Sequence, residues 1–155
     1  MTQAFRLAQN HGVKNRTVTP SSPAEVHRPQ RSARTQAALE RVRKICFALP
    51  GVTERVSHGA PCFFVRDKKT FVMFMDNHHA DGRLAIWCAA PEGMQQGLIA
   101  NDAERFFRPP YVGHRGWIGV RLDVRPDWKR IAATIGDAYR LSAPRSLVAE
   151  LTEPA

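Results

Sequence analysis

The sequence predicts an α+β domain in which an antiparallel sheet carries its main helices on one face. Three observations lead to this fold class: a helical apolar period before residue 50, a period of two between residues 55 and 89, and a second helical stripe after residue 126. The predicted strands follow each other through short connections, which can join only antiparallel neighbours. A chain of 155 residues has room for one core.

The first predicted helix covers residues 35–49, where apolar residues recur every third and fourth position. Glu40 and Lys44 on the opposite face form a favourable pair one turn apart. Pro50 and Gly51 end the helix, because proline disfavours helical geometry in the residue before it. The apolar stripe consists of Ala38, Leu39, Val42, Ile45, Cys46 and Leu49.

Four strands are predicted next, because short runs rich in Val, Phe, Met and Ile alternate with turn-forming residues. Alternation within the third run places Phe71, Met73 and Met75 on one side and Val72 and Phe74 on the other. In the fourth run, Ala85 and Trp87 oppose Leu84, Ile86 and Cys88 in the same way. The four strands are residues 55–58, 62–66, 70–75 and 83–89.

The remaining elements are a weak helix at residues 91–100, a strand at residues 117–122 and a long helix at residues 126–141. In the last strand, Trp117 and Arg121 lie on the side opposite to the apolar residues Ile118, Val120 and Leu122. We therefore expect Trp117 to point outward. Both sides of the middle strands are apolar, but helices cover only one. The second side must therefore curl onto itself, be covered by the loop at residues 106–111, or serve as a contact surface.

Basic residues concentrate at the start of the chain. The net charge is +9 and the pI is about 10.3, which predicts attraction to polyanions. The first 35 positions hold six basic residues and one acid, with no hydrophobic period. We therefore predict a disordered basic extension at residues 1–34 and a single domain at residues 35–152. A secretory apolar core and a membrane-spanning stretch are both missing, so a soluble cytoplasmic protein is expected.

Cysteine and glycine patterns predict no cofactor, no metal and no catalytic set. Cys46, Cys62 and Cys88 are far apart, which signals neither a disulfide framework nor a zinc site. The loop at residues 76–81 holds two histidines and two carboxylates, but adjacent histidines seldom reach one ion. Cys62 with His58 or His114 as a base is not expected to act as a nucleophile, because a turn separates residues 58 and 62.

Several motifs resemble a known family: LPGVTE at residues 49–54, HGAPCF at residues 58–63 and PPYVGHRGWIGV at residues 109–120. With the last helix, this pattern resembles the MmcQ/YjbR-like proteins over about residues 36–150. The resemblance implies the fold of the bacterial frataxin homologue and DNA binding through two projecting wings. Iron binding of the frataxin type is not expected, because Glu40 stands among cations in the first helix.

The first candidate site is the turn at residues 66–69, where Arg66, Lys68 and Lys69 would meet a phosphate backbone. If the wing description applies, this turn is one wing. The alternative is a solvated hairpin whose lysines keep the sheet edge soluble.

The second candidate site is the segment 111–117, in which His114 and Arg115 lie between two glycines and precede Trp117. Arginine can hold a phosphate and an aromatic ring can stack on a base. Strand phase places Arg121 and Trp87 nearby. The alternative is structural: Tyr111 and Trp117 cover the second side of the sheet, with Arg115 stacked on an indole.

These residues predict a DNA-binding protein that contacts the phosphate backbone with little sequence specificity. One alternative is a small anionic or aromatic metabolite, bound or turned over in a pocket around His114, Arg115 and Trp117. Another is an interaction module that pairs its apolar sheet side with a second chain. Neither the ligand nor the oligomeric state follows from the residues.

Overall fold

The computed structural model describes residues 31–151, which belong to one compact unit. Of the extension predicted at residues 1–34, residues 1–30 lie outside the described residues. The first helix, α1 (Ala33–Phe47), begins two residues earlier than predicted. It begins there because the Ser32 hydroxyl accepts a hydrogen bond from the Thr35 amide at 3.2 Å and caps the helix.

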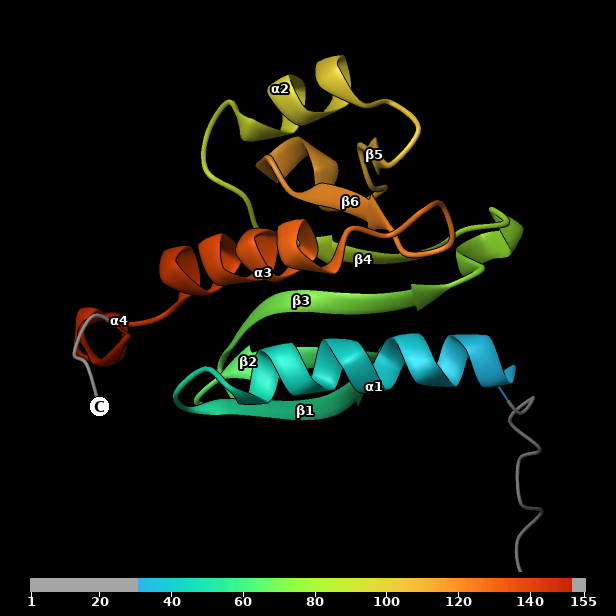
Figure 1. Cartoon of the computed structure of the whole chain (residues 1–155). Helices are drawn as coiled ribbons and strands as arrows, with labels where there is room; N and C mark the ends of the chain where they lie inside the picture. Colours follow the sequence, from blue (N-terminus) through green and yellow to red (C-terminus); the bar gives the residue numbers. More distant parts are fainter. Residues whose placement is uncertain (1–30, 152–155) are drawn as a thin grey trace, which may run out of the picture. The chain divides into compact units, whose positions relative to one another are not determined.

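Six strands form one antiparallel sheet, which confirms the predicted α+β class (Figure 1). Their order across the sheet is β1-β2-β3-β4-β6-β5, so β5 and β6 exchange places relative to the chain. The two-residue β5 forms one edge, and it was not predicted. The strands are β1 (Val52–Ser57), β2 (Ala60–Val65), β3 (Lys69–Asp76), β4 (Leu84–Cys88), β5 (Phe106–Phe107) and β6 (Ile118–Arg121).

The two long helices, α1 and α3 (Trp128–Ser142), pack on one face of the sheet (Figure 1). A shorter helix, α2 (Met94–Asn101), packs against the β5 edge. The last helix, α4 (Arg145–Glu150), was not predicted. Among residues 31–151, no helix has the length and apolar character needed to cross a membrane.

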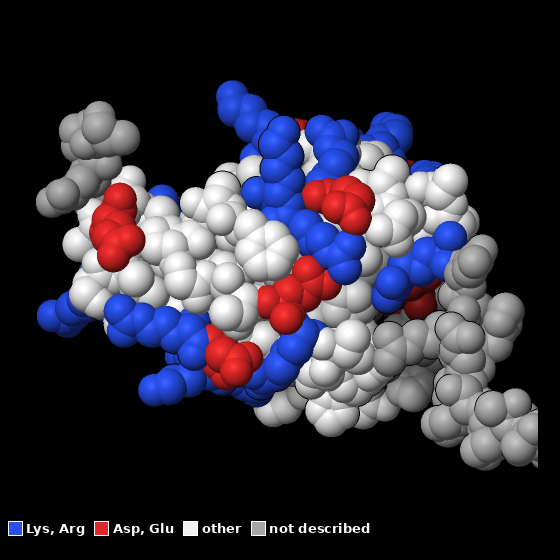
Figure 2. All heavy atoms as spheres, turned by 90° about the horizontal axis from the view of Figure 1, so that it is seen from below, with Lys and Arg blue, Asp and Glu red and all other residues white. Residues whose placement is uncertain are grey.

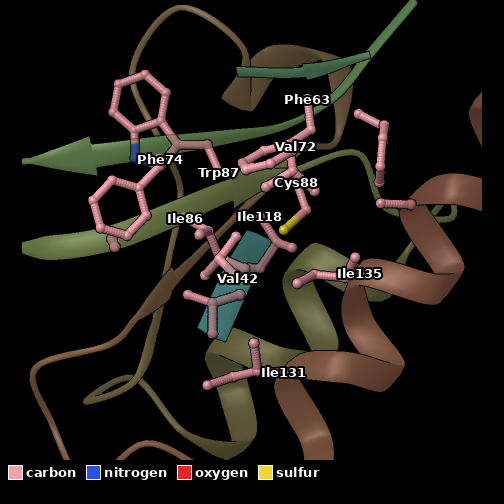
Figure 3. Packing of buried hydrophobic residues seen from close by; sticks show 14 of the residues in the cluster. Val42, Phe63, Val72, Phe74, Ile86, Trp87, Cys88, Ile118, Ile131 and Ile135 are labelled. Atoms are coloured by element: carbon pink, nitrogen blue, oxygen red, sulfur yellow. The ribbon is translucent and has the colours of Figure 1, made fainter. Parts of the chain in front are cut away.

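The core lies between the sheet and the helices α1 and α3. Cross-strand pairs place Phe63, Val72, Cys88 and Ile118 in one row across four strands. Figure 3 shows this row with Val42 of α1 and with Ile131 and Ile135 of α3. Every member of the row is completely buried.

The side predicted for Phe71 is wrong. Phe63 pairs with Val72 while Phe64 pairs with Thr70, so Phe71 is the extra residue of a β-bulge. The bulge shifts the alternation by one position, and the Phe71 ring lies 5.7 Å from the ring of Tyr139 on α3. Phe71 therefore faces the helices together with Val72, instead of sharing a side with Met73.

The opposite face of the sheet, called here the outer face, carries Cys62, Met73 and Trp87 in one cross-strand row that ends at Gly119. The Phe107 ring takes the space over Gly119, because a Cβ built there would lie 2.4 Å from a ring carbon. Part of this face is covered by the segment that follows β5, where Tyr111 and Val112 line one cavity together with Cys62, Met73 and Trp87. The structure thus favours partial coverage by a loop, with a cavity left between the loop and the sheet.

Candidate nucleic-acid interface

The turn at residues 66–69 joins β2 to β3 in a conformation fixed by its backbone. Arg66 and Asp67 both have positive φ values, 49° and 57°, as in the primed turns that suit the twist of a hairpin. The Lys68 amide closes the turn by donating to the Val65 carbonyl at 3.0 Å. The Arg66 amide donates to the Gly51 carbonyl at 2.7 Å, so the turn is tied to the segment that follows α1.

The one acid of this turn, Asp67, already forms an ion pair with Arg55 of the neighbouring strand. The Asp67 carboxylate accepts a hydrogen bond from Arg55 of β1, whose guanidinium also lies 3.6 Å from the centre of the Phe64 ring. Arg66, Lys68 and Lys69 are exposed. None of these three forms an ion pair with a carboxylate in the part of the chain that the structure describes. The turn therefore presents three uncompensated positive charges.

Two further cations lie at this end of the fold. Lys44 is in the last turn of α1, and Arg145 begins α4. The side chains of Leu147 on α4 and of Arg66 both approach Gly51, where a Cβ would lie 3.1 Å from Leu147 Cδ1 and 3.5 Å from Arg66 Cγ. We call the set Lys44, Arg66, Lys68, Lys69 and Arg145 the basic end.

Charges elsewhere on the visible surface are mixed. Figure 2 shows basic side chains projecting at the end where α4 lies, where an acidic side chain is also visible, and other basic side chains standing beside acids nearer the middle of the view. Arg43, for example, donates to both Glu40 and Glu54 at 2.8 Å. None of the five cations of the basic end forms an ion pair among the described residues, and the acids at this end are Asp67, which is paired with Arg55, and Glu150 of α4.

The segment 113–117 lies at the same end of the sheet as the turn, because Ile118 pairs with Cys88 and Cys88 pairs with Val72. Its 3-10 turn, η2 (Gly113–Arg115), exposes His114 and Arg115. Buried Gln95 of α2 holds the segment by donating to the carbonyls of Gly113 and Trp117 at 2.8 and 2.6 Å.

The outward position predicted for Trp117 is wrong. The side chain is only 5% exposed and belongs to the core. The hydrogen bond from Gln95 anchors the Trp117 carbonyl beneath α2, and the Arg115 guanidinium lies 5.7 Å from the indole centre. This geometry matches the structural alternative considered for the segment, in which Arg115 stacks on an indole, and it removes Trp117 as an exposed stacking surface.

Arg121 is separated from the other predicted cations. It pairs with Ala85 at the far end of β6, whereas Arg115 precedes the start of that strand. Its guanidinium makes two hydrogen bonds of 2.9 Å to the Asp123 carboxylate, which raise the pKa of Arg121 above its ordinary value. The Arg121 charge is therefore already compensated.

A cavity of about 520 Å³ opens on the outer face, toward the end of β3 opposite to the turn. It borders Trp87, as expected for a pocket on this side, but His114, Arg115 and Trp117 do not line it. The lining combines apolar residues of the sheet with polar residues at the rim. The apolar part is Ala60, Cys62, Met73, Met75, Trp87 and Val112.

Comparison with known proteins identifies the family. A sequence model of the YjbR family matches residues 47–141. The chain belongs to the YjbR family. This assignment confirms the resemblance seen in the motifs at residues 49–54, 58–63 and 109–120.

A solved structure shares the fold of this YjbR-family chain. It is the crystal structure of Deinococcus radiodurans protein DR2400, described as a DUF419 domain, with a TM-score of 0.59 and 14% sequence identity. The match covers 75% of this chain and 88% of that one. No curated protein matches the sequence.

The cysteines of this YjbR-family chain lie in surroundings that disfavour a nucleophile. Burial raises the pKa of Cys62, and its thiol donates to the Ser57 carbonyl at 3.8 Å. Burial also raises the pKa values of Cys46 and Cys88 well above the usual range. Because the reactive species is the thiolate, these environments oppose covalent catalysis. Within residues 31–151, no three side chains of the metal-ligating types come together.

The residues that sequence reasoning missed are Arg55, Lys44 and Arg145. Arg55 decides the charge of the turn, because it occupies Asp67. The signal for that pairing is only indirect, because the register pairs Arg55 with Cys62 and the side chain reaches the turn across the Phe64 ring. Lys44 and Arg145 have no such signal, because they reach this end through helix packing.

Proposed function

We propose that this YjbR-family protein binds the phosphate backbone of duplex DNA through its basic end. The observation that carries the proposal is the turn at residues 66–69, where Arg66, Lys68 and Lys69 are exposed while Asp67 is occupied by Arg55. Phosphate contacts supply most of the affinity of sequence-independent DNA binding, and they require cations that are free of carboxylates. The turn meets that requirement.

Chemistry and position both support this assignment. An arginine can hold a phosphate through two parallel hydrogen bonds, while lysines act as mobile point charges. Lys44 and Arg145 extend the positive surface beyond the turn. His114 and Arg115, exposed at the same end of the sheet, would meet a second stretch of backbone.

Binding through these residues carries little sequence information. Side chains read base edges when a helix or a ribbon enters a groove, and contacts to phosphates only position the protein. The longest helices, α1 and α3, each bury one face against the sheet and present no dedicated recognition surface at the basic end. We therefore expect similar affinity for duplexes of unrelated sequence.

The test is a titration of the full-length protein with a fluorescent 20-base-pair duplex at salt concentrations between about 50 and 200 mM. Contacts to three to five phosphates give a slope of log affinity against log salt of roughly −3 to −4.5. A second duplex of unrelated sequence should give the same slope. An affinity that does not change with salt would rule out backbone binding.

A further inference from the structure

We propose that the cavity on the outer face binds a small uncharged aromatic molecule. The site is distinct from the basic end, because it lies toward the opposite end of β3. The proposal therefore goes beyond DNA binding and can fail or hold independently of it.

The size and lining of the cavity suit such a ligand. A volume of about 520 Å³ falls within the range typical of small-molecule sites, roughly 300–1,000 Å³. Trp87 borders the cavity with only 2% of its surface exposed, and the flexible thioethers of Met73 and Met75 adapt to the edge of a ring. The sheet thus supplies an apolar floor for an aromatic group.

No permanently charged side chain among residues 31–151 lines the cavity. Its polar lining residues are Ser57, His58, His78, His79 and Tyr111, and no lysine, arginine or carboxylate lines it. Arg55 lies opposite Cys62, which lines the cavity, but its guanidinium is already paired with Asp67. Burial, with the neighbouring His79, lowers the pKa of His78, which keeps its imidazole neutral at pH 7. An ionised ligand would find no lysine, arginine or carboxylate as a partner here, and burying it would be costly.

Two polar atoms beside the cavity are without hydrogen-bond partners among the described residues. They are the Trp87 Nε1 and the His78 Nε2. The two rings meet edge to face, with centroids 4.9 Å apart. A buried donor without a partner costs free energy that a ligand acceptor would recover. Because the indole nitrogen is buried, the His78 ring must turn aside before a ligand acceptor reaches it.

The wall that carries His78 is the strained part of the site. Asn77, His79 and Ala80 have φ values of 51°, 48° and 58°, which non-glycine residues rarely adopt. Across the rim, the Tyr111 hydroxyl and His79 Nε2 are hydrogen-bonded at 3.1 Å, although the Tyr111 side chain is 69% exposed. Strain of this kind is typical of ligand sites. A hydroxyl on the ligand could bond the same imidazoles.

The test compares 1-naphthol with 1-naphthoate, which share one ring system but differ in charge at pH 7. Nitrogen-15 NMR of the full-length protein follows the three indole N–H signals, assigned with Trp87→Phe and Trp128→Phe. We expect 1-naphthol to shift the Trp87 signal in a saturable way, and 1-naphthoate to bind at least about tenfold more weakly. Trp87→Phe should weaken 1-naphthol binding roughly three- to tenfold, because it removes the donor together with part of the aromatic surface. Trp128→Phe, which changes a tryptophan on α3, should leave the affinity unchanged.

Tyr111→Ala removes one wall of the cavity at an exposed position, and it keeps the proposal testable if Trp87→Phe fails to fold. It should also weaken 1-naphthol binding. The proposal is wrong if 1-naphthoate binds as tightly as 1-naphthol, if the Trp87 signal does not move, or if neither Trp87→Phe nor Tyr111→Ala weakens binding.

Discussion

The hydroxyl of Tyr139 donates a hydrogen bond of 2.6 Å to the carbonyl oxygen of Pro50. This contact joins the end of α3 to the turn that follows α1. The next carbonyl in the chain, that of Gly51, accepts the Arg66 amide at 2.7 Å. Two consecutive carbonyls therefore link a buried helix residue to the basic turn, and the position of that turn depends on the packing of α3.

Tyr139→Phe should lower the free energy of unfolding by about 1–3 kcal/mol, because the Pro50 carbonyl loses its partner while the ring packing is kept. Denaturation by urea, followed by circular dichroism, measures the change. Tyr111→Phe removes a hydroxyl from an exposed side chain and should change the free energy of unfolding by less than about 0.5 kcal/mol. Equal stability of Tyr139→Phe and the wild type would show that the buried hydroxyl contributes nothing.

Gly119→Ala should destabilise the fold by about 1–3 kcal/mol, because the added Cβ meets the Phe107 ring and forces it to move. The matched control is Gly97→Ala on α2, where a Cβ meets nothing within 4 Å. That change should stabilise by up to about 1 kcal/mol, since alanine is the better helix former. Thermal unfolding of both variants gives the comparison, and a loss of stability in Gly97→Ala as large as that in Gly119→Ala would contradict it.

Asp123 should make the fold sensitive to acid. Burial opposes its ionisation, but the hydrogen bonds from Arg121 and from the Leu84 amide outweigh burial and hold the pKa of Asp123 below its usual 3.8. The carboxylate therefore stabilises the folded state above that pH, and the contribution is lost as the pH falls through the lower, folded pKa.

Urea midpoints at pH 7 and pH 3 test this expectation. Asp123→Asn should be less stable than the wild type at pH 7, and should lose less stability on acidification. Arg121→Gln should also be less stable than the wild type at pH 7 and should also lose less stability on acidification, because it removes the main donor to Asp123. A loss on acidification as large in Asp123→Asn as in the wild type would show that another carboxylate is responsible.

Local patterns predicted the fold class and most elements, because apolar periodicity reports directly which face of a helix or strand is buried. The bulge at Phe71 could not be predicted, since it depends on the pairing of β3 with β2. The edge strand β5 has only two residues, too few for any period. Trp117 follows the alternation of β6 but precedes its first paired residue, Ile118, and α2 covers it.

The sequence predicted only part of the candidate site, because local patterns do not report contacts between distant segments. A turn of three cations is visible in the sequence at residues 66–69, but the neutralisation of Asp67 by Arg55 comes from tertiary structure. The pocket was predicted around His114, Arg115 and Trp117, none of which lines the cavity, although Trp87 does. The rim of the cavity depends on the segment after β5 crossing the sheet to reach His79. Long-range contacts of this kind leave no local signal.

The measurement that tests the central claim most directly is the salt dependence of DNA binding in the variant Lys68→Gln/Lys69→Gln. Lys129→Gln is the matched control, because Lys129 is equally exposed but lies in the first turn of α3, at the end of that helix opposite to Tyr139. If both turn lysines contact phosphates, the slope of log affinity against log salt becomes shallower by about 1.8 in the double variant and stays unchanged in Lys129→Gln. An unchanged slope in the double variant, in a protein that still binds DNA, would contradict the assignment of the interface to the basic end.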